Sequence, residues 1–282
     1  MSQTLYRGMD AAALEREYNA RDSVPDFDTE FAAYQRLSGA AAAGLPHTTY
    51  VYDAVSGEAL DIYPAAPGSP VFMWLHGGYW RSLSKADNAF IAGGLVPEGI
   101  SVVIPDYTLA PAATLAEITR QVGAALAWVV RHTGHPARIH VGGSSAGGHL
   151  AAALLTSGRM AALGLPADTV ASATVVSGLF DLEPLRHCSM NAWLRMDAAA
   201  ARRHSPLFDI QPNSPAQLIA SHGGRETAEF ARQTAAYVDA WHAAGNRGSH
   251  VAMPDHNHFD IAVALATPGT ALNDALIATI HP

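Results

Sequence analysis

The stretch Arg138–Leu150, which reads RIHVGGSSAGGHL, decides the fold of this chain. Its apolar start predicts a short strand, its glycine-rich centre predicts a tight corner, and the Ala- and Leu-rich residues that follow predict a helix. Inside it, Gly143-Ser144-Ser145-Ala146-Gly147 matches G-x-S-x-G, the pattern of a nucleophile elbow when a strand precedes it and a helix follows. The same pattern occurs by chance in flexible Gly/Ser loops, so the rest of the chain must decide.

The composition predicts a folded protein with a large core. The chain has 282 residues, of which 49% are hydrophobic and 15% are charged, which argues against disorder. A formal charge of −8 without a basic run disfavours binding to nucleic acid or to an anionic membrane. We find neither a signal-peptide core nor a run of about 18 apolar residues that would predict a transmembrane helix.

Cys188 is the only cysteine, which excludes an intrachain disulfide and fits a reducing compartment. We therefore expect a cytoplasmic protein. Cys188 is a conceivable nucleophile, but no activating motif surrounds it, which favours a packed thiol.

Strand and helix patterns alternate along most of the chain. Residues 49–53 and 59–63 predict a hairpin, and continuous apolar runs such as 71–75 are typical of strands covered on both faces. Further strands are expected at 101–105, before Ser145, at 171–177, at 217–222 and at 249–253. Strand and helix in repetition predict an α/β fold in one domain, residues 1–282, with a mostly parallel central sheet and helices on both faces.

Two segments fall outside this alternation. Residues 1–45 carry two predicted helices, at 10–18 and 28–43, and form an N-terminal arm that either decorates the surface or closes over the functional site. Residues 185–213 are polar and partly helical, and they predict a lid-like insertion at the carboxyl edge of the sheet.

Reactive side chains in an open parallel sheet collect at the carboxyl ends of its strands. Ser145, Glu226 and His258 each follow a predicted strand, in this order along the chain. A serine hydroxyl needs a base to accept its proton, and the base needs a carboxylate to fix its tautomer. The sequence predicts Ser145 as nucleophile, His258 as base and Glu226 as acid, with Asp255 as the alternative acid.

Backbone N–H groups are expected to bind the oxyanion that such a reaction forms. The N–H of Ala146 follows the nucleophile, and the second donor should come from the loop Gly77-Gly78-Tyr79. Tyr79 and Trp80 could also stack on a planar substrate or fill the core, and His149 packs its helix or lines the pocket.

A metal site is the competing interpretation of the last loop. His256 and His258 could form a metal-binding pair, with Asp255 or Asp260 adding oxygen ligands. No third histidine lies at helical spacing, and His258 has a better use as the base. We expect no metal and no cofactor.

The motifs resemble one family along most of the chain. His76-Gly77-Gly78-Tyr79-Trp80 resembles the H-G-G-Y-W signature of the arylformamidase (kynurenine formamidase) branch of the α/β-hydrolases, which is related to hormone-sensitive-lipase-like esterases. Other segments similar to that branch are Asp106–Pro111, Gly143–Leu150, Asp181–Leu185, Asn191 with Ser205-Pro206, Glu226–Phe230 and Asn257–Phe259. The acid of that family is commonly Asp, so Glu226 departs from its pattern by one methylene.

The resemblance implies an α/β-hydrolase fold and a cofactor-free serine hydrolase with a small-molecule substrate. The expected reaction, through an acyl-enzyme, cleaves a small carboxylic ester or an aryl formamide or amide such as N-formylkynurenine. The resemblance also adds Asn191 to the pocket and makes a homodimer plausible.

Two other classes of function stay open. One is a catalytically silent scaffold that binds a ligand or a protein, although such members usually lack the serine or the histidine. The other is a metal-dependent hydrolase.

Overall fold

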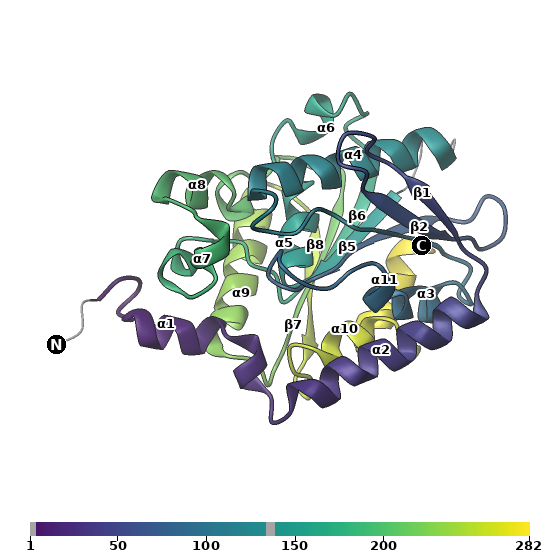
Figure 1. Cartoon of the computed structure of the whole chain (residues 1–282). Helices are drawn as coiled ribbons and strands as arrows, with labels where there is room; N and C mark the ends of the chain where they lie inside the picture. The colour runs from purple at the N-terminus through teal and green to yellow at the C-terminus, as the bar shows by residue number, and fades with distance from the viewer. Residues whose placement is uncertain (1–3, 134–138) are drawn as a thin grey trace.

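A computed structural model describes residues 4–133 and 139–282 of the chain. Within these residues, one sheet has the strand order β1-β2-β4-β3-β5-β6-β7-β8 (Figure 1). Its strands are β1 (Thr48–Val51), β2 (Ala59–Tyr63), β3 (Val71–Leu75), β4 (Ser101–Pro105), β5 (Ile139–Ser144), β6 (Val170–Val176), β7 (Gln217–Gly223) and β8 (Gly248–Met253). Arg138, expected to start a strand, lies outside the described residues.

Only β2 runs against the other strands of the described sheet. β1 pairs with β2, and β2 with β4, in antiparallel fashion, whereas all pairs from β4 to β8 are parallel. The hairpin and the mostly parallel sheet that the sequence predicts are thereby confirmed.

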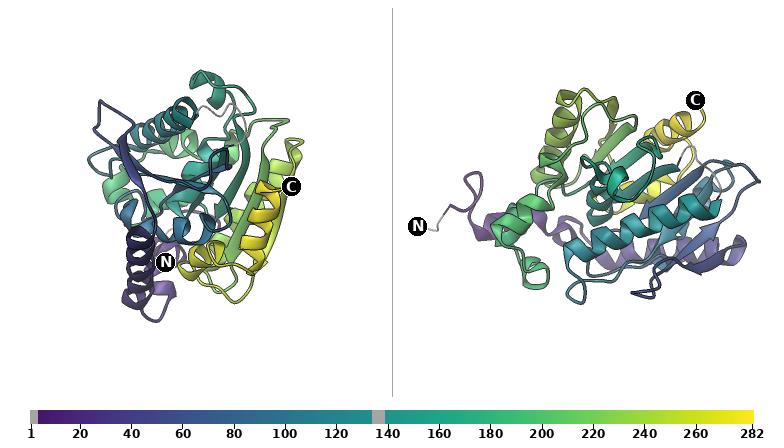
Figure 2. Two further views of the ribbon diagram at one scale, coloured as in Figure 1. Left: turned by 90° about the vertical axis from the view of Figure 1, so that its right-hand side faces the viewer. Right: turned by 90° about the horizontal axis from the view of Figure 1, so that it is seen from above.

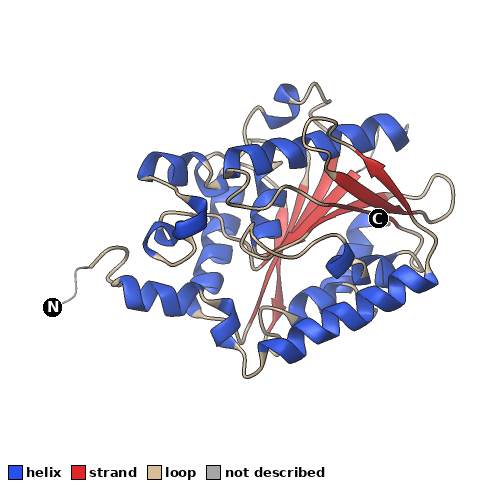
Figure 3. Ribbon diagram, in the orientation of Figure 1, coloured by secondary structure: helices blue, strands red, loops and turns tan. Residues whose placement is uncertain are grey.

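Helices cover both faces of the sheet, as Figures 2 and 3 show. The α-helices are α1 (Ala11–Tyr18), α2 (Phe27–Gly44), α3 (Phe90–Leu95), α4 (Leu115–Thr133), α5 (Ala146–Ala153), α6 (Arg159–Ala162), α7 (Asn191–Leu194), α8 (Ala198–Arg203), α9 (Ala228–Ala243), α10 (Asp260–Leu265) and α11 (Ala271–Ile280). Short 3-10 helices are η1 (Ala20–Ser23), η2 (Ala86–Asn88), η3 (Pro184–His187) and η4 (Pro206–Phe208).

The two faces carry separate hydrophobic cores. In β3, Val71, Met73 and Leu75 pack toward α4, α5 and α9, whereas Phe72 and Trp74 pack toward α2, α3, α10 and α11. Successive side chains of a strand point to opposite faces, so a continuous apolar run is what a doubly covered strand requires. Each large apolar side chain buried in this way contributes about 1.5–3 kcal/mol.

The structure differs from the sequence expectation at the end of the chain. The alanine-rich sequence after the loop at 255–260 predicts one closing helix, but two are present, α10 and α11, separated at Pro268-Gly269. Proline has no N–H to continue a helix, and Gly269 adopts a φ of +82° that favours glycine.

α3 has a sequence that gives little helical signal because it contains Gly93 and Gly94. The structure explains Gly94: a Cβ there would lie 1.9 Å from the carbonyl oxygen of Ala266, just after α10. The glycine therefore permits the close packing of α3 on the end of α10.

The N-terminal arm connects the two faces of the sheet. Side chains of α1, such as Leu14 and Tyr18, belong to the core on the α9 side, and those of α2, such as Tyr34 and Ala41, belong to the core on the α3 side. Asp10 caps α1 through the N–H of Ala13. Among the described residues, no helix combines the length and the apolar character needed to cross a lipid bilayer.

Candidate active site

Ser145 occupies the corner between β5 and α5. Its φ of 58° and ψ of −119° are rare for a residue with a side chain, and its N–H donates to the carbonyl of Val176 at 2.9 Å. Strained backbone of this kind costs about 1–3 kcal/mol and persists only where the surroundings enforce it. The strand, corner and helix that the G-x-S-x-G pattern requires are all present.

The glycines of the pattern are required by close backbone contacts. A Cβ at Gly143 would lie 2.3 Å from the carbonyl oxygen of Gly147, and a Cβ at Gly147 would lie 1.9 Å from that of Leu75. The start of α5 therefore packs against the ends of β5 and β3 at a distance that only glycine allows.

We expect Gly147→Ala to lower the free energy of unfolding by about 3 kcal/mol or more, because backbone rather than a flexible side chain would have to move. Gly39→Ala is the matched control. Gly39 lies in α2, and a Cβ there would have no packing neighbour within 4 Å. It should raise the free energy of unfolding by about 0.5–1 kcal/mol. Urea unfolding of both variants measures the difference, and equal effects would contradict the packing argument.

Glu226 and His258 lie in contact at the carboxyl ends of β7 and β8. Nδ1 of His258 is 2.7 Å from Oε2 of Glu226, and both side chains are at most 5% exposed. Oε1 of Glu226 accepts hydrogen bonds from Oγ of Ser177 and from the N–H of Gly223, each at 2.5 Å. The carboxylate is therefore fixed by two donors on one oxygen and holds the imidazole with the other.

Burial by itself would raise the pKa of Glu226. The charge and hydrogen bond of His258, together with the donors Ser177 and Gly223, outweigh burial and hold the pKa below its usual value. The ionised carboxylate therefore stabilises the folded protein at neutral pH, and this contribution is lost as the pH falls through the folded-state pKa.

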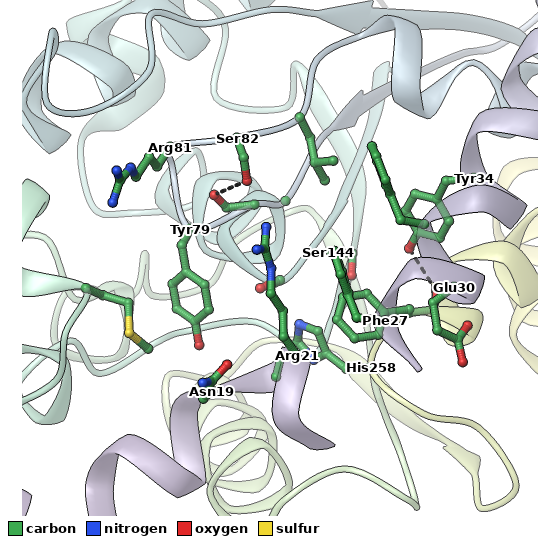
Figure 4. Close-up of a pocket in the computed structure, with 18 of the residues that line it drawn as sticks. Asn19, Arg21, Phe27, Glu30, Tyr34, Tyr79, Arg81, Ser82, Ser144 and His258 are labelled. Atoms are coloured by element: carbon green, nitrogen blue, oxygen red, sulfur yellow. Dashed lines mark hydrogen bonds between the residues drawn. The ribbon is translucent and has the colours of Figure 1, made fainter. Parts of the chain in front are cut away.

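Ser145 and His258 face the same cavity, which has a volume of about 510 Å³. Figure 4 shows His258 at this cavity together with Tyr79 of the loop after β3 and Arg21 of the arm. Within the described chain, the hydroxyl of Ser145 forms no hydrogen bond, so it is free to meet a ligand in the cavity. Catalytic hydrogen bonds often tighten only when a substrate binds.

The loop after β3 has an unusual backbone. Gly78, Tyr79 and Trp80 have φ of +94°, 50° and 55° in succession, and a Cβ at Gly78 would lie 2.2 Å from the carbonyl oxygen of Ser82. The N–H groups of Gly77, Gly78, Tyr79 and Ala146 have no hydrogen-bond acceptor among the described residues. Gly77 and Tyr79 also line the cavity, so unpaired donors of this loop lie at its wall.

Three residues that the sequence assigned to the pocket do not line this cavity. Trp80 is fully buried in the core, with its ring edge-on to that of His149 at 5.0 Å. Nε2 of His149 is 2.7 Å from the carbonyl oxygen of His204, and burial lowers the pKa of His149 to about 4. Asn191 closes the turn of α7 through its bonds to Arg186 and Met196. Packing and turn formation account for these side chains.

Sequence reasoning missed residues of the arm and of the insertion. The arm contributes to the cavity wall through Glu15, Asn19, Ala20, Arg21, Phe27, Glu30, Phe31 and Tyr34, and the insertion through Ser189, Met190 and Trp193. The spacing of Phe27, Phe31 and Tyr34 on one helix face was the available signal. Ser177 could have been found because it directly follows β6, at the same edge of the sheet.

The alternative acid lies elsewhere. Asp255 is 85% exposed and its carboxylate is 3.7 Å from the guanidinium of Arg225, itself exposed.

Across residues 4–133 and 139–282, no group of three His, Cys, Asp or Glu side chains could hold a metal ion. Burial raises the pKa of the Cys188 thiol to about 12, with Glu15 adding to the effect, so this thiol stays protonated at neutral pH.

Comparison with known proteins identifies the family. A family model described as the alpha/beta hydrolase fold matches residues 72–259, and this chain belongs to that family. It is 30% identical to the kynurenine formamidase of Danio rerio over 236 residues, which cover 81% of this chain and 80% of the relative. It is 28% identical to the kynurenine formamidase of Salmo salar, covering 96% and 97% of the two chains. The resemblance to this branch is thereby confirmed.

Solved structures of related hydrolases superpose on this chain along most of its length. A protein described as a candidate thioesterase from Silicibacter sp. TM1040 superposes with a TM-score of 0.83 at 27% identity, covering 95% of this chain and 99% of that chain. An esterase of the bacterial hormone-sensitive lipase family superposes with a TM-score of 0.70 at 25% identity, covering 100% and 98% of the two chains. The chain is a serine hydrolase of the α/β-hydrolase fold.

Proposed function

We propose that Ser145, His258 and Glu226 form the catalytic triad of a hydrolase that cleaves aryl formamides or small esters. The contact of 2.7 Å between Nδ1 of His258 and Glu226 carries this proposal, because it leaves Nε2 unprotonated and available to Ser145. The carboxylate also stabilises the imidazolium that forms when the serine proton is taken. The extra methylene of Glu226 is accommodated by its bonds to Ser177 and Gly223.

The reaction proceeds in two halves. Oγ of Ser145 attacks the carbonyl carbon while its proton passes to Nε2 of His258, and the carbonyl oxygen becomes an oxyanion. The N–H groups of Ala146 and of the loop from Gly77 to Tyr79 are the proposed donors to that oxyanion, each worth about 3 kcal/mol. His258 returns the proton to the leaving amine or alcohol, which gives an acyl-enzyme, and water then releases the acid by the reverse sequence.

The cavity favours a substrate of modest size. Its volume of about 510 Å³ lies in the range typical of small-molecule sites. The guanidinium groups of Arg21 and Arg81 line it and stack on the rings of Phe27 and Trp193, at 4.4 and 4.5 Å, and have no carboxylate partner among the described residues. Two unpaired cations beside an aromatic wall fit an aryl substrate that carries an anionic group, as N-formylkynurenine does.

A labelling experiment and a substrate panel test the proposal. A fluorophosphonate probe should attach covalently to Ser145, and a chelator should not change turnover. N-formylkynurenine should be hydrolysed with a higher kcat/KM than formanilide, which lacks the amino-acid group. A protein that is not labelled would be a silent scaffold, and loss of turnover with chelator would indicate a metal-dependent hydrolase. Equal kcat/KM for both formamides would remove the role of the two arginines.

Two further proposals concern the setting of the enzyme. The single cysteine, buried and protonated, is compatible with a reducing, cytoplasmic location. A homodimer remains a proposal that size-exclusion chromatography with light scattering tests directly.

A further inference from the structure

We propose that Glu30 and Tyr34 of α2 are positioning residues that hold His258 in place for proton transfer. The inference rests on the proposed role of His258 as the base. Residues four apart lie on the same face of a helix, and each of these two bonds to a residue adjacent to His258 in the chain. The N-terminal arm, which is distant in sequence, therefore holds the turn that contains His258 through the residues before and after it.

Glu30 acts on this turn through Asn257. Oε1 of Glu30 accepts a hydrogen bond from Nδ2 of Asn257 at 2.7 Å. Oδ1 of Asn257 accepts from the backbone N–H of Phe259 at 2.7 Å and of Asp260 at 3.0 Å, and Oδ1 of Asp260 accepts from the N–H of Asn257 at 2.8 Å. These reciprocal bonds close the turn around His258. Because Glu30 binds the amide nitrogen of Asn257, the amide oxygen must face the turn.

Tyr34 fixes the other side of the same turn. Its hydroxyl donates to the carbonyl oxygen of Phe259 at 2.8 Å. The ring is 8% exposed and packs against Phe90 of α3 with ring centroids 4.8 Å apart. Burial raises the pKa of Tyr34, so the hydroxyl remains a donor across the physiological pH range. The turn is therefore tied to a helix that is itself packed on the core.

The acid is held by the same arm through α1. Oγ1 of Thr227, the residue after Glu226, donates to the carbonyl oxygen of Glu17 at 2.5 Å, and Oε2 of Glu17 accepts from the N–H of Glu229 at 3.1 Å. Next to Glu17, the fully buried Tyr18 donates to Glu229 at 2.6 Å. The arm thus contacts the loops of both members of the acid–base pair.

Two distinct roles for Glu30 have to be separated because its side chain also lines the cavity. If its charge acted on the substrate, removing the charge alone would change binding. If it acts through Asn257, a neutral acceptor of the same shape should suffice. Glu30→Gln keeps a carbonyl oxygen for the amide of Asn257, whereas Glu30→Ala removes the acceptor.

The experiment measures kcat and KM for p-nitrophenyl acetate, a small substrate without a net charge. We expect Glu30→Ala to lower kcat about tenfold or more with little change in KM, because small displacements of a catalytic group are costly. Glu30→Gln should recover most of that loss, and Tyr34→Phe should lower kcat severalfold. Gln35→Ala, on the exposed side of the same helix, should behave as the wild type.

A double-mutant cycle tests the route through Asn257. The variant with both Glu30→Ala and Asn257→Ala should be no slower than Asn257→Ala alone, because both changes break one chain of contacts. Independent, multiplicative losses would overturn the proposal, as would wild-type kcat in Glu30→Ala or an equal loss in Glu30→Gln. If Glu30→Ala fails to fold in a thermal melt, Tyr34→Phe and Glu30→Gln decide.

The same assays separate this inference from the proposed triad. A dead Ser145→Ala variant alongside an unaffected Glu30→Ala variant would remove only the positioning role. An active Ser145→Ala variant would remove the triad and, with it, the reason to position His258.

Discussion

Ser145→Ala is expected to lower kcat by a factor on the order of 10⁴ to 10⁶ while the protein stays folded. The hydroxyl is the proposed nucleophile, and the buried thiol of Cys188 stays protonated and does not replace it. The fold should tolerate the change because the Ser145 hydroxyl has no hydrogen-bond partner within the described chain. Alanine keeps the Cβ, so the strained corner is unaltered.

Turnover of p-nitrophenyl acetate and of N-formylkynurenine measures this effect, with urea unfolding in parallel. Ser157→Ala serves as the control, because Ser157 is exposed and does not line the cavity. A Ser145→Ala variant with more than a few per cent of wild-type kcat would show that another group performs the attack.

Glu226→Gln should lower kcat on the order of 10³ to 10⁴-fold and also destabilise the fold. The carboxylate accepts from three donors, namely Ser177, the N–H of Gly223 and His258. A glutamine offers one oxygen and one NH₂ group, so the NH₂ must face a donor whichever way it turns. In one orientation the imidazole of His258 loses the acceptor that fixes its tautomer. In the other, Ser177 and the N–H of Gly223 lose their acceptor in a buried site.

Asp255→Asn is the matched control for the acid. Among the described residues, the one ion-pair partner of its carboxylate is the exposed Arg225, so kcat and the free energy of unfolding should stay close to wild type. The two variants are compared by kcat/KM and urea unfolding at pH 7.5. If Asp255→Asn were the damaging change and Glu226→Gln the harmless one, the assignment of the acid would be reversed.

The fold could be predicted from the sequence because local and long-range signals agreed. The run Val71–Leu75 is apolar throughout because both of its faces are covered. The glycines around Ser145 are required because a Cβ at these positions would collide with neighbouring backbone atoms. The split of the last helix was missed, although Pro268-Gly269 marks it. α3 was missed since its glycines serve packing rather than helix formation.

The residues that line the cavity were predicted less completely than the positions of the loops that carry Glu226 and His258. Glu226 and His258 follow strands, so topology alone brings them to one edge of the sheet. No sequence rule connects Arg21 or Glu30 with that edge, because a helical arm can pack anywhere on the surface. Trp80 and His149 were assigned to the pocket from their neighbours in sequence, whereas the positive φ values of the loop allow adjacent side chains to point in different directions.

The arm has a consequence for how the enzyme becomes active during synthesis. Glu30 leaves the ribosome before its partner Asn257, which emerges 227 positions later. At about 5–20 residues per second, that interval is roughly ten to forty-five seconds. During this time α2 can fold locally but has no turn to hold, so we expect a nascent chain to acquire hydrolytic activity only after Asn257 has emerged.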